Sequence, residues 1–296
     1  MGHRFILCYA AGFTPENQLN GFRSTSLVTS HHRQPRSLVI LGAGYTGKVL
    51  YPLAKTQGWR TYATSRSPET HLGHIHPMDR LTFNLDDQNT WDNIPRDAHV
   101  IWCFPALPQA KAKQFLDQRY RHGGRLILLG STSAYGKERH NPVDESTPLN
   151  IALPRVQSEE DIRKSCGAVL LRLAGLYGPD RHVLDWIRKG KVANRTQFVN
   201  LIHIEDVAEI CLAALDKAVD GETYIVSDGH PRQWSEIFTE ASKRWMLGPY
   251  PPSPAKHSGK RLTINKLQAT LYASFLYPDL YQALDEIEQG RCQHKK

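Results

Sequence analysis

The feature that most constrains this chain is a glycine-rich turn between an apolar run and an amphipathic segment. Gly42, Gly44 and Gly47 form the pattern GxGxxG directly after the β-branched run Ser37–Leu41. Apolar side chains then recur at helical spacing, at Val49, Leu50 and Leu53. In many α/β folds, the first strand of the sheet turns sharply into a helix in this way. The alternative is a turn whose glycines serve packing alone.

Short apolar runs alternate with helix-like segments along the rest of the chain, which is typical of a parallel sheet with crossover helices. Several runs are continuously apolar, as expected for strands covered on both faces. The expected strands are Ser37–Leu41, Arg60–Thr64, Arg80–Phe83, His99–Phe104, Arg125–Leu129, Ala168–Leu173 and Glu222–Val226. The sequence therefore predicts an α/β fold, a Rossmann-type doubly wound parallel sheet with a small C-terminal substrate lobe.

The chain divides into a leader, a main domain and a tail. Residues 1–36 contain one short apolar stretch and a basic, proline-containing join, and we interpret them as a disordered leader. A signal peptide and an incorrectly assigned start codon are the alternatives. Residues 37–285 form the main domain, with the substrate lobe drawn from about 176–200 and 228–285. Residues 286–296 form a basic tail.

The formal net charge of +8 raises the question of nucleic-acid binding. About three quarters of the excess lies at the two ends of the chain, and the middle is nearly balanced. The end residues concerned are Arg4, Arg23, Arg33 and Arg36 against Glu16, and then Arg291, Lys295 and Lys296. This distribution disfavours a nucleic-acid-binding face.

Cysteine usage and hydropathy indicate a protein of the cytoplasm. The five cysteines are scattered, no two have zinc-site spacing, and we expect reduced thiols and no metal site. The histidine cluster at 71, 74 and 76 lacks a carboxylate or thiolate set, and we interpret it as solvated. No stretch approaches the ~20 apolar residues that span a bilayer, so no membrane association is expected.

The glycine turn has the chemistry of a dinucleotide site. The first glycine permits the turn, the second lets the backbone approach a diphosphate, and the third lets the helix pack closely on the strand. The phosphates then lie at the helix N-terminus, beside Tyr45 and Thr46. We therefore expect a nicotinamide dinucleotide as cofactor.

We expect the residues near the end of the second strand to determine the preference for NAD or NADP, because an acid there would hold the ribose hydroxyls of NAD. The residues there are Thr64, Ser65, Arg66 and Ser67, without an acid beside them. A guanidinium with hydroxyl neighbours suits a 2′-phosphate, so we expect NADP to be preferred, with NAD as the alternative. Arg66 as an exposed loop residue without a ligand is the other interpretation.

Several further segments make the chain resemble the extended short-chain dehydrogenase/reductases, the group of NAD-dependent epimerases and dehydratases. The resemblance covers about 250 residues and is greatest for the atypical, YeeZ-like branch. It is carried by NLDD from Asn84, LLGSTSAYG ending at Gly136, ESTPLN from Glu145, LLRLAGLYGPDRH from Leu170, NLIHIEDVAEICLAAL from Asn200, ETYIVSDG from Glu222 and Lys260-Arg261.

The resemblance implies further cofactor contacts. The loop after the third strand flanks the adenine in that family, which points to Leu85 and to Asp86 or Asp87. Asn84 replaces the family's usual first aspartate. The loop after the fourth strand, with Phe104 and Pro105, is expected along the cofactor. Pro105 as a simple strand terminator is the alternative.

The resemblance also implies a catalytic Ser or Thr, a Tyr about 25 residues later, and a Lys four residues after the Tyr. Ser131, four residues before Tyr135, matches the hydroxyl partner. The segment from Leu153 to Asp161 contains neither Tyr nor Lys and carries three acids. Carboxylates would raise the pKa of a tyrosine there instead of lowering it, so the usual proton relay is missing. Ser131 and Tyr135 remain the candidate catalytic residues.

Five more residues are candidates for binding substrate, namely Arg155, Arg172, Tyr177, Arg181 and His203. Arginines would hold an anionic substrate, but Arg172 pairing with an acid under the sheet is an alternative. Tyr135 and Tyr177 are equally well explained as packing residues, and His203 as a cap for neighbouring backbone.

Two functions follow from these patterns. The first is an NADP-preferring oxidoreductase of the epimerase/dehydratase type with an altered catalytic set, acting on a small polar or sugar-like molecule. The second is a non-catalytic NADP-binding sensor or scaffold protein, because the Tyr and Lys are absent. The oligomeric state stays open, with a homodimer as one alternative.

Overall fold

The computed structural model describes residues 36–119, 124–136, 142–254 and 258–293. The predicted leader lies outside the described residues except for Arg36. The guanidinium of Arg36 lies 4.1 Å from the centre of the Trp59 ring and pairs with Asp216. Arg36 therefore packs against the main domain.

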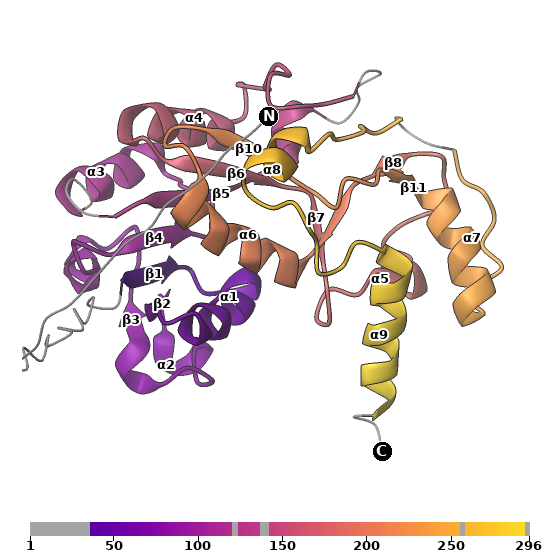
Figure 1. The fold of residues 1–296 in the computed structure, drawn as a ribbon, viewed down its shortest axis with the longest axis horizontal. Helices are drawn as coiled ribbons and strands as arrows, with labels where there is room; N and C mark the ends of the chain where they lie inside the picture. The colour runs from indigo at the N-terminus through magenta and orange to yellow at the C-terminus, as the bar shows by residue number, and fades with distance from the viewer. Residues whose placement is uncertain (1–35, 120–123, 137–141, 255–257, 294–296) are drawn as a thin grey trace, which may run out of the picture. The chain divides into compact units, whose positions relative to one another are not determined.

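All seven predicted strands are present and form one parallel sheet (Figure 1). The strands are β1 (Ser37–Leu41), β2 (Arg60–Ser65), β3 (Arg80–Thr82), β4 (His99–Trp102), β5 (Leu126–Ser131), β6 (Val169–Leu173) and β10 (Thr223–Val226). Their order is β10-β6-β5-β4-β1-β2-β3. The predicted α/β fold is confirmed.

The strand order reverses at β1, because β2 lies on one side of it and β4 on the other. Val39 of β1 is in register with Tyr62 of β2 on one side and with Val100 of β4 on the other. In open α/β sheets a crevice forms beyond the carboxyl ends of the strands at such a switch point. Strand β4 ends at Trp102, two residues before the predicted boundary, so Cys103 and Phe104 lie in the loop at this crevice.

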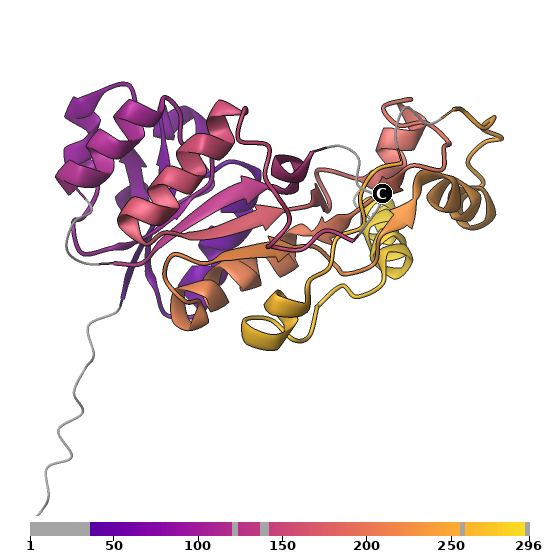
Figure 2. The same ribbon diagram turned by 90° about the horizontal axis from the view of Figure 1, so that it is seen from above.

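Alternating residues of β1 contact two helix layers. Leu38 and Ile40 pack in a hydrophobic cluster with α1 (Tyr45–Thr56) and α6 (Ile204–Lys217). Val39 and Leu41 pack in a second cluster with α3 (Gln109–Arg119) and α4 (Pro154–Cys166). Figure 2 shows α4 and α6 on opposite sides of the sheet. Both faces of β1 are thus buried, which explains its continuously apolar sequence.

A third hydrophobic cluster joins α5 (Val183–Arg188), α7 (Trp234–Trp245) and α9 (Leu280–Gln293). These helices draw on the two segments predicted to build the substrate lobe. The predicted boundary at 285 is wrong, because α9 continues through it to Gln293. Arg291, assigned to a basic tail, donates to both carboxylate oxygens of Asp185 at 3.1 Å and so ties α9 to α5.

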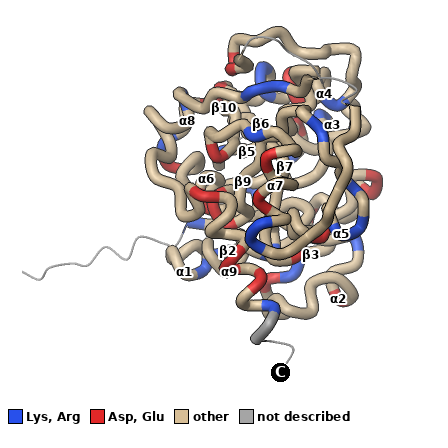
Figure 3. The backbone as a smooth tube through the Cα atoms, turned by 90° about the vertical axis from the view of Figure 1, so that its right-hand side faces the viewer, with Lys and Arg blue, Asp and Glu red and all other residues tan. Residues whose placement is uncertain are grey.

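The charged residues of the described chain are interspersed, as Figure 3 shows for one side of the backbone. Among the described residues, no helix is both long enough and apolar enough to cross a membrane. The remaining elements are α2 (Pro68–His71), η1 (Pro77–Asp79), η2 (Gln88–Asn93), η3 (Thr132–Tyr135), β7 (Gly175–Tyr177), β8 (Phe198–Val199), β9 (Leu201–His203), β11 (Arg232–Gln233) and α8 (Asn265–Thr270).

Candidate cofactor site

At each of the three glycines of the turn after β1, a Cβ would meet a different environment. Gly42 has a φ of +79°, and a Cβ there would lie 2.6 Å from the Phe104 ring. A Cβ on Gly47 would lie 2.9 Å from Cβ of Ala43 and 3.3 Å from Cγ2 of Ile40 in β1, so glycine lets α1 pack closely on the turn and the strand. A Cβ on Gly44 would meet no atom within 4 Å. Gly44 therefore leaves open space where the backbone can be approached from outside.

The first turn of α1 is suited to an anion. Gly44 is the N-cap and provides no side-chain hydrogen bond, and the first turn carries no acid. The N–H groups of Tyr45 and Thr46 have no intrahelical acceptor because they lie in the first turn of the helix, and no side chain caps them there. A diphosphate at this end would also gain from the positive end of the helix dipole.

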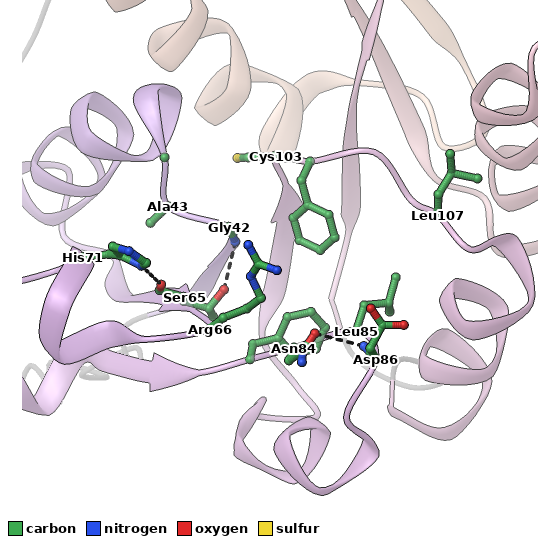
Figure 4. Close-up of a pocket in the computed structure, with 14 residues that line it drawn as sticks. Gly42, Ala43, Ser65, Arg66, His71, Asn84, Leu85, Asp86, Cys103 and Leu107 are labelled. Atoms are coloured by element: carbon green, nitrogen blue, oxygen red, sulfur yellow. Dashed lines mark hydrogen bonds between the residues drawn. The ribbon is translucent and has the colours of Figure 1, made fainter.

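A cavity of about 510 Å³ adjoins this turn (Figure 4). Its volume lies within the range of small-molecule and cofactor sites. Apart from His71 of α2, the lining residues lie at or just after the ends of β1 to β4, in the crevice expected from the strand order. They are Gly42, Ala43, Gly44, Thr64, Ser65, Arg66, His71, Phe83, Asn84, Leu85, Asp86, Cys103, Phe104 and Leu107.

The end of β2 provides the polar wall of this cavity. Ser65 Oγ and His71 Nδ1 share a hydrogen bond of 3.0 Å, and Ser65 Oγ accepts from the N–H of Ser67 at 3.1 Å. The exposed side chain of Arg66 turns back over the cavity, toward the Gly42 turn (Figure 4). Thr64 fixes this strand end to the turn, because its hydroxyl accepts from the N–H of Gly42 at 2.9 Å.

The loop after β3 provides the opposite wall. Leu85 is buried and Asp86 is exposed, and both line the cavity. Asn84 Oδ1 accepts from the N–H of Asp86 at 3.1 Å, so Asn84 shapes the loop. Asp86 pairs with Lys111 at 2.6 Å.

The loop after β4 closes the cavity with Phe104 and Leu107. The ring of Phe104 lies 5.2 Å from Trp102, centre to centre, and is held by aromatic packing. Pro105 is exposed and does not line this cavity, so its predicted contact with the cofactor is not supported by the geometry.

A second cavity of about 230 Å³ shares Gly42, Gly44 and Cys103 with the first. It extends along the ends of β5 and β6, past Tyr45, Thr46, Gly130, Leu173, Leu176 and Arg181. The Arg181 guanidinium lies 4.6 Å from the centre of the Tyr45 ring. Burial raises the pKa of Tyr45 to about 12.

Ser131 follows Gly130 directly at the end of β5, and it is part of a hydrogen-bonded chain. Ser131 Oγ donates to Ser133 Oγ at 3.2 Å, and Arg155 Nη2 donates to Ser133 Oγ at 2.9 Å. Arg155 Nη1 donates to Glu159 at 3.0 Å. Val156, at the position where the family's tyrosine is expected, is fully buried.

Two predicted site residues are placed away from these cavities. Tyr135 and Arg172 are fully buried and line a separate space of about 160 Å³. Arg172 pairs with Glu159 at 3.0 Å and Glu160 at 2.8 Å, as in the alternative interpretation of that residue. Burial raises the pKa of Tyr135 far above its ordinary value. We therefore withdraw Arg172 as a substrate ligand and Tyr135 as a catalytic acid or base.

His203 and Tyr177 also have structural roles. His203 Nδ1 accepts from the N–H of Glu205 at 3.3 Å and caps α6. Its ring lies 3.7 Å from the ring of Tyr277 and 5.1 Å from that of Tyr177, centre to centre. Burial lowers the pKa of His203 to about 4, so it is neutral at physiological pH. Neither residue lines the two cavities at the glycine turn.

Sequence reasoning missed several lining or supporting residues, namely Thr64, His71, Cys103, Leu107, Ser133 and Glu159. Thr64 ends a predicted strand and Cys103 is the residue before the end of another, which was an available signal. His71 had no such signal, because its contact with Ser65 depends on the short helix α2. Within the described residues, no group of three or more His, Cys, Asp or Glu side chains could hold a metal.

Comparison with known proteins places this geometry in context. The family model described as the NAD dependent epimerase/dehydratase family matches residues 38–227. The protein YeeZ of Escherichia coli strain K12 is 24% identical over 270 residues, covering 82% of this chain and 97% of YeeZ.

Two solved structures share the fold. A conserved protein of unknown function from Silicibacter pomeroyi is 22% identical, with a TM-score of 0.67 over 86% of this chain and 99% of that one. A short-chain dehydrogenase/reductase superfamily protein from Agrobacterium tumefaciens, solved with bound NAD, is 14% identical. Its TM-score is 0.69 over 88% of this chain and 98% of that one.

Proposed function

This chain belongs to the NAD-dependent epimerase/dehydratase family, and on that premise we propose that it is an NADP-preferring oxidoreductase of the epimerase/dehydratase type. Family membership supports a nicotinamide dinucleotide as cofactor. The glycine turn fits such a cofactor, because Gly44 leaves the start of α1 open to a diphosphate. The distant Agrobacterium protein with bound NAD has the same fold.

The single observation that carries the NADP preference is the position of Arg66 in the cavity wall at the end of β2. A guanidinium there would bind a 2′-phosphate through charge-assisted hydrogen bonds. Among the described residues that line this cavity, Asp86 is the one acid, and it pairs with Lys111. An acid at the end of β2, which would favour the ribose hydroxyls of NAD, is absent from that lining.

The test is calorimetric titration of the folded protein with NADPH and NADH. We expect NADPH to bind more tightly, and Arg66→Ala to weaken NADPH binding by about 1.5–3 kcal/mol, the range of hydrogen bonds to charged groups. NADH binding should stay nearly unchanged. Equal losses for both nucleotides would refute the role of Arg66, and no heat with either would refute the proposed function.

A non-catalytic NADP-binding sensor is the second candidate, favoured by buried Val156 in place of a tyrosine. The two candidate functions differ in whether they require the hydroxyl of Ser131. An oxidoreductase should lose NADPH turnover on its substrate in Ser131→Ala. If the protein is a sensor, Ser131→Ala should leave every measured phenotype unchanged, whereas Gly44→Asp should abolish them.

A further inference from the structure

Arg155 is held in one orientation by groups on both of its sides. Nη2 donates to Ser133 Oγ at 2.9 Å, and Nη1 donates to Glu159 Oε1 at 3.0 Å. The Glu159 side chain is 2% exposed, and its second oxygen accepts from Arg172 at 3.0 Å. The fixed guanidinium has therefore lost most of its side-chain entropy before any ligand arrives.

This guanidinium keeps donors for a ligand. The two hydrogen bonds described use two of the five N–H groups of an arginine. The Arg155 side chain is 22% exposed, in contrast to Arg172, which is fully buried. Arg155 can thus pair with an anion from solvent without losing its contact with Glu159.

The position of Arg155 relates it to the proposed reaction site. Ser133, its hydrogen-bond partner, lies 3.2 Å from Ser131 Oγ, and Ser131 directly follows Gly130, which lines the second cavity. Arg155 Nη2 therefore lies within two hydrogen-bond lengths of Ser131 Oγ, and a group bound at Ser133 Oγ would lie within two as well. That distance corresponds to a few covalent bonds in a small molecule.

Two more cations lie along the same region. Lys260 donates to the carbonyl oxygen of Gly136, at the end of the loop that holds Ser131 and Ser133. Arg181 lines the second cavity. The nearest acid in the chain of hydrogen bonds, Glu159, is already shared between two arginines. Glu159 and Glu160 together pair with three arginines, Arg155, Arg163 and Arg172, so this ion-pair cluster carries one excess positive charge, which favours an anion.

We infer that Arg155 and Ser133 form a carboxylate-binding site, so that the substrate carries a carboxylate a few bonds from its carbonyl or hydroxyl carbon. The planar guanidinium matches a carboxylate in geometry as well as charge. Ser133 would add a hydroxyl contact. This inference rests on the proposed function, which supplies the adjoining cofactor.

The experiment titrates the protein with oxamate and with succinate by calorimetry, once free and once saturated with NADPH. Oxamide and succinamide serve as neutral counterparts, and inorganic phosphate as a second anion. We expect both carboxylates to bind and the neutral compounds not to bind. Arg155→Met should weaken carboxylate binding by about 10- to 100-fold, as expected for a lost charge-assisted contact. Arg155→Lys should lie between the two.

Lys164→Met is the matched control, because Lys164 is an exposed cation on the same helix. It should leave carboxylate binding at the wild-type value. NADPH binding and circular dichroism of every variant report whether the fold is intact, and Glu159 retains Arg172 as a partner in Arg155→Met.

Carboxylate binding that is absent in the wild type, or unchanged in Arg155→Met, would overturn the inference. Binding of phosphate in preference to both carboxylates would overturn it as well. A protein that binds carboxylates through Arg155 but shows no heat with NADPH or NADH would retain this site and lose the proposed function. The two failures are thus distinguishable.

Discussion

His203 should make the stability of the protein depend on pH between 7 and 5. Its ring is 2% exposed, and burial lowers its pKa from 6.5 to about 4. In this interval the unfolded chain binds a proton at His203 that the native protein does not bind. Stability contributed by the neutral ring is therefore complete above pH 6.5 and falls as the pH drops toward 4.

The magnitude follows from the two pKa values. Full protonation of the unfolded chain at this one site would cost about 3.4 kcal/mol of folding free energy. Between pH 7 and pH 5 the loss is about 1.8 kcal/mol, which is a sizeable part of the usual stability of a domain. His182, whose pKa burial likewise lowers to about 4, acts in the same direction.

His203→Asn separates this site from the others. Asparagine is a favourable N-cap and can still accept from the N–H of Glu205, so the start of α6 is preserved. The variant should be less stable than the wild type at pH 7, because the ring no longer packs between Tyr177 and Tyr277. Its stability should fall by about 1.8 kcal/mol less than that of the wild type on going from pH 7 to pH 5.

The assay is urea unfolding at both pH values, followed by circular dichroism, for wild type and variant. Groups whose pKa is raised by burial, such as Asp206 and Asp228, are present in both proteins and cancel in the comparison. An identical pH dependence in the two proteins would refute the assignment of a neutral, buried imidazole at this position.

Two further substitutions probe the glycine turn and the support of the C-terminal segment. Gly44→Asp should abolish calorimetric binding of both nucleotides and leave the melting temperature within about 2 °C, because its side chain meets open space and its carboxylate would repel a diphosphate. A variant that still binds would contradict the proposed cradle. Asp206→Ala should destabilise the protein by about 2–5 kcal/mol in urea unfolding, because the N–H groups of Leu276 and Tyr277 and the hydroxyl of Tyr272 lose their acceptor. A loss below 1 kcal/mol would show that water replaces the carboxylate.

The place of the proposed cofactor site in the fold was predictable because it depends on local sequence. The turn at Gly42 and the side chain of Arg66 belong to strand ends, and parallel strands bring their carboxyl ends to one edge of the sheet. Asp86 and Leu85 follow the next strand end for the same reason. The loop after β4 continues past Pro105, which does not line the cavity, and reaches it with Leu107.

The other half depends on pairing between distant side chains, which sequence spacing does not reveal. From the sequence, Arg172 was a candidate ligand for an anionic substrate. In the structure, Glu159 and Glu160 of α4 pair with its buried guanidinium. Tyr135, four residues after Ser131, was a candidate catalytic residue but packs beside Arg172, whose guanidinium lies 5.6 Å from its ring centre. Burial and ion pairing at these positions are set by helix packing.

Val156 and Glu160 stand at the positions where the resemblance implies the tyrosine and the lysine, and Arg155 is the neighbouring cation. This difference changes what the site can do. A tyrosine can give up a proton, whereas an arginine stays protonated in proteins and only stabilises negative charge. Arg155 would therefore hold an anion without moving a proton to it. If the protein reduces a carboxylate-bearing carbonyl compound, its rate should not follow the titration of a tyrosine. If such a compound binds beside NADPH without turnover, the pairing of Arg155 with Ser133 serves recognition, and the sensor is the better description.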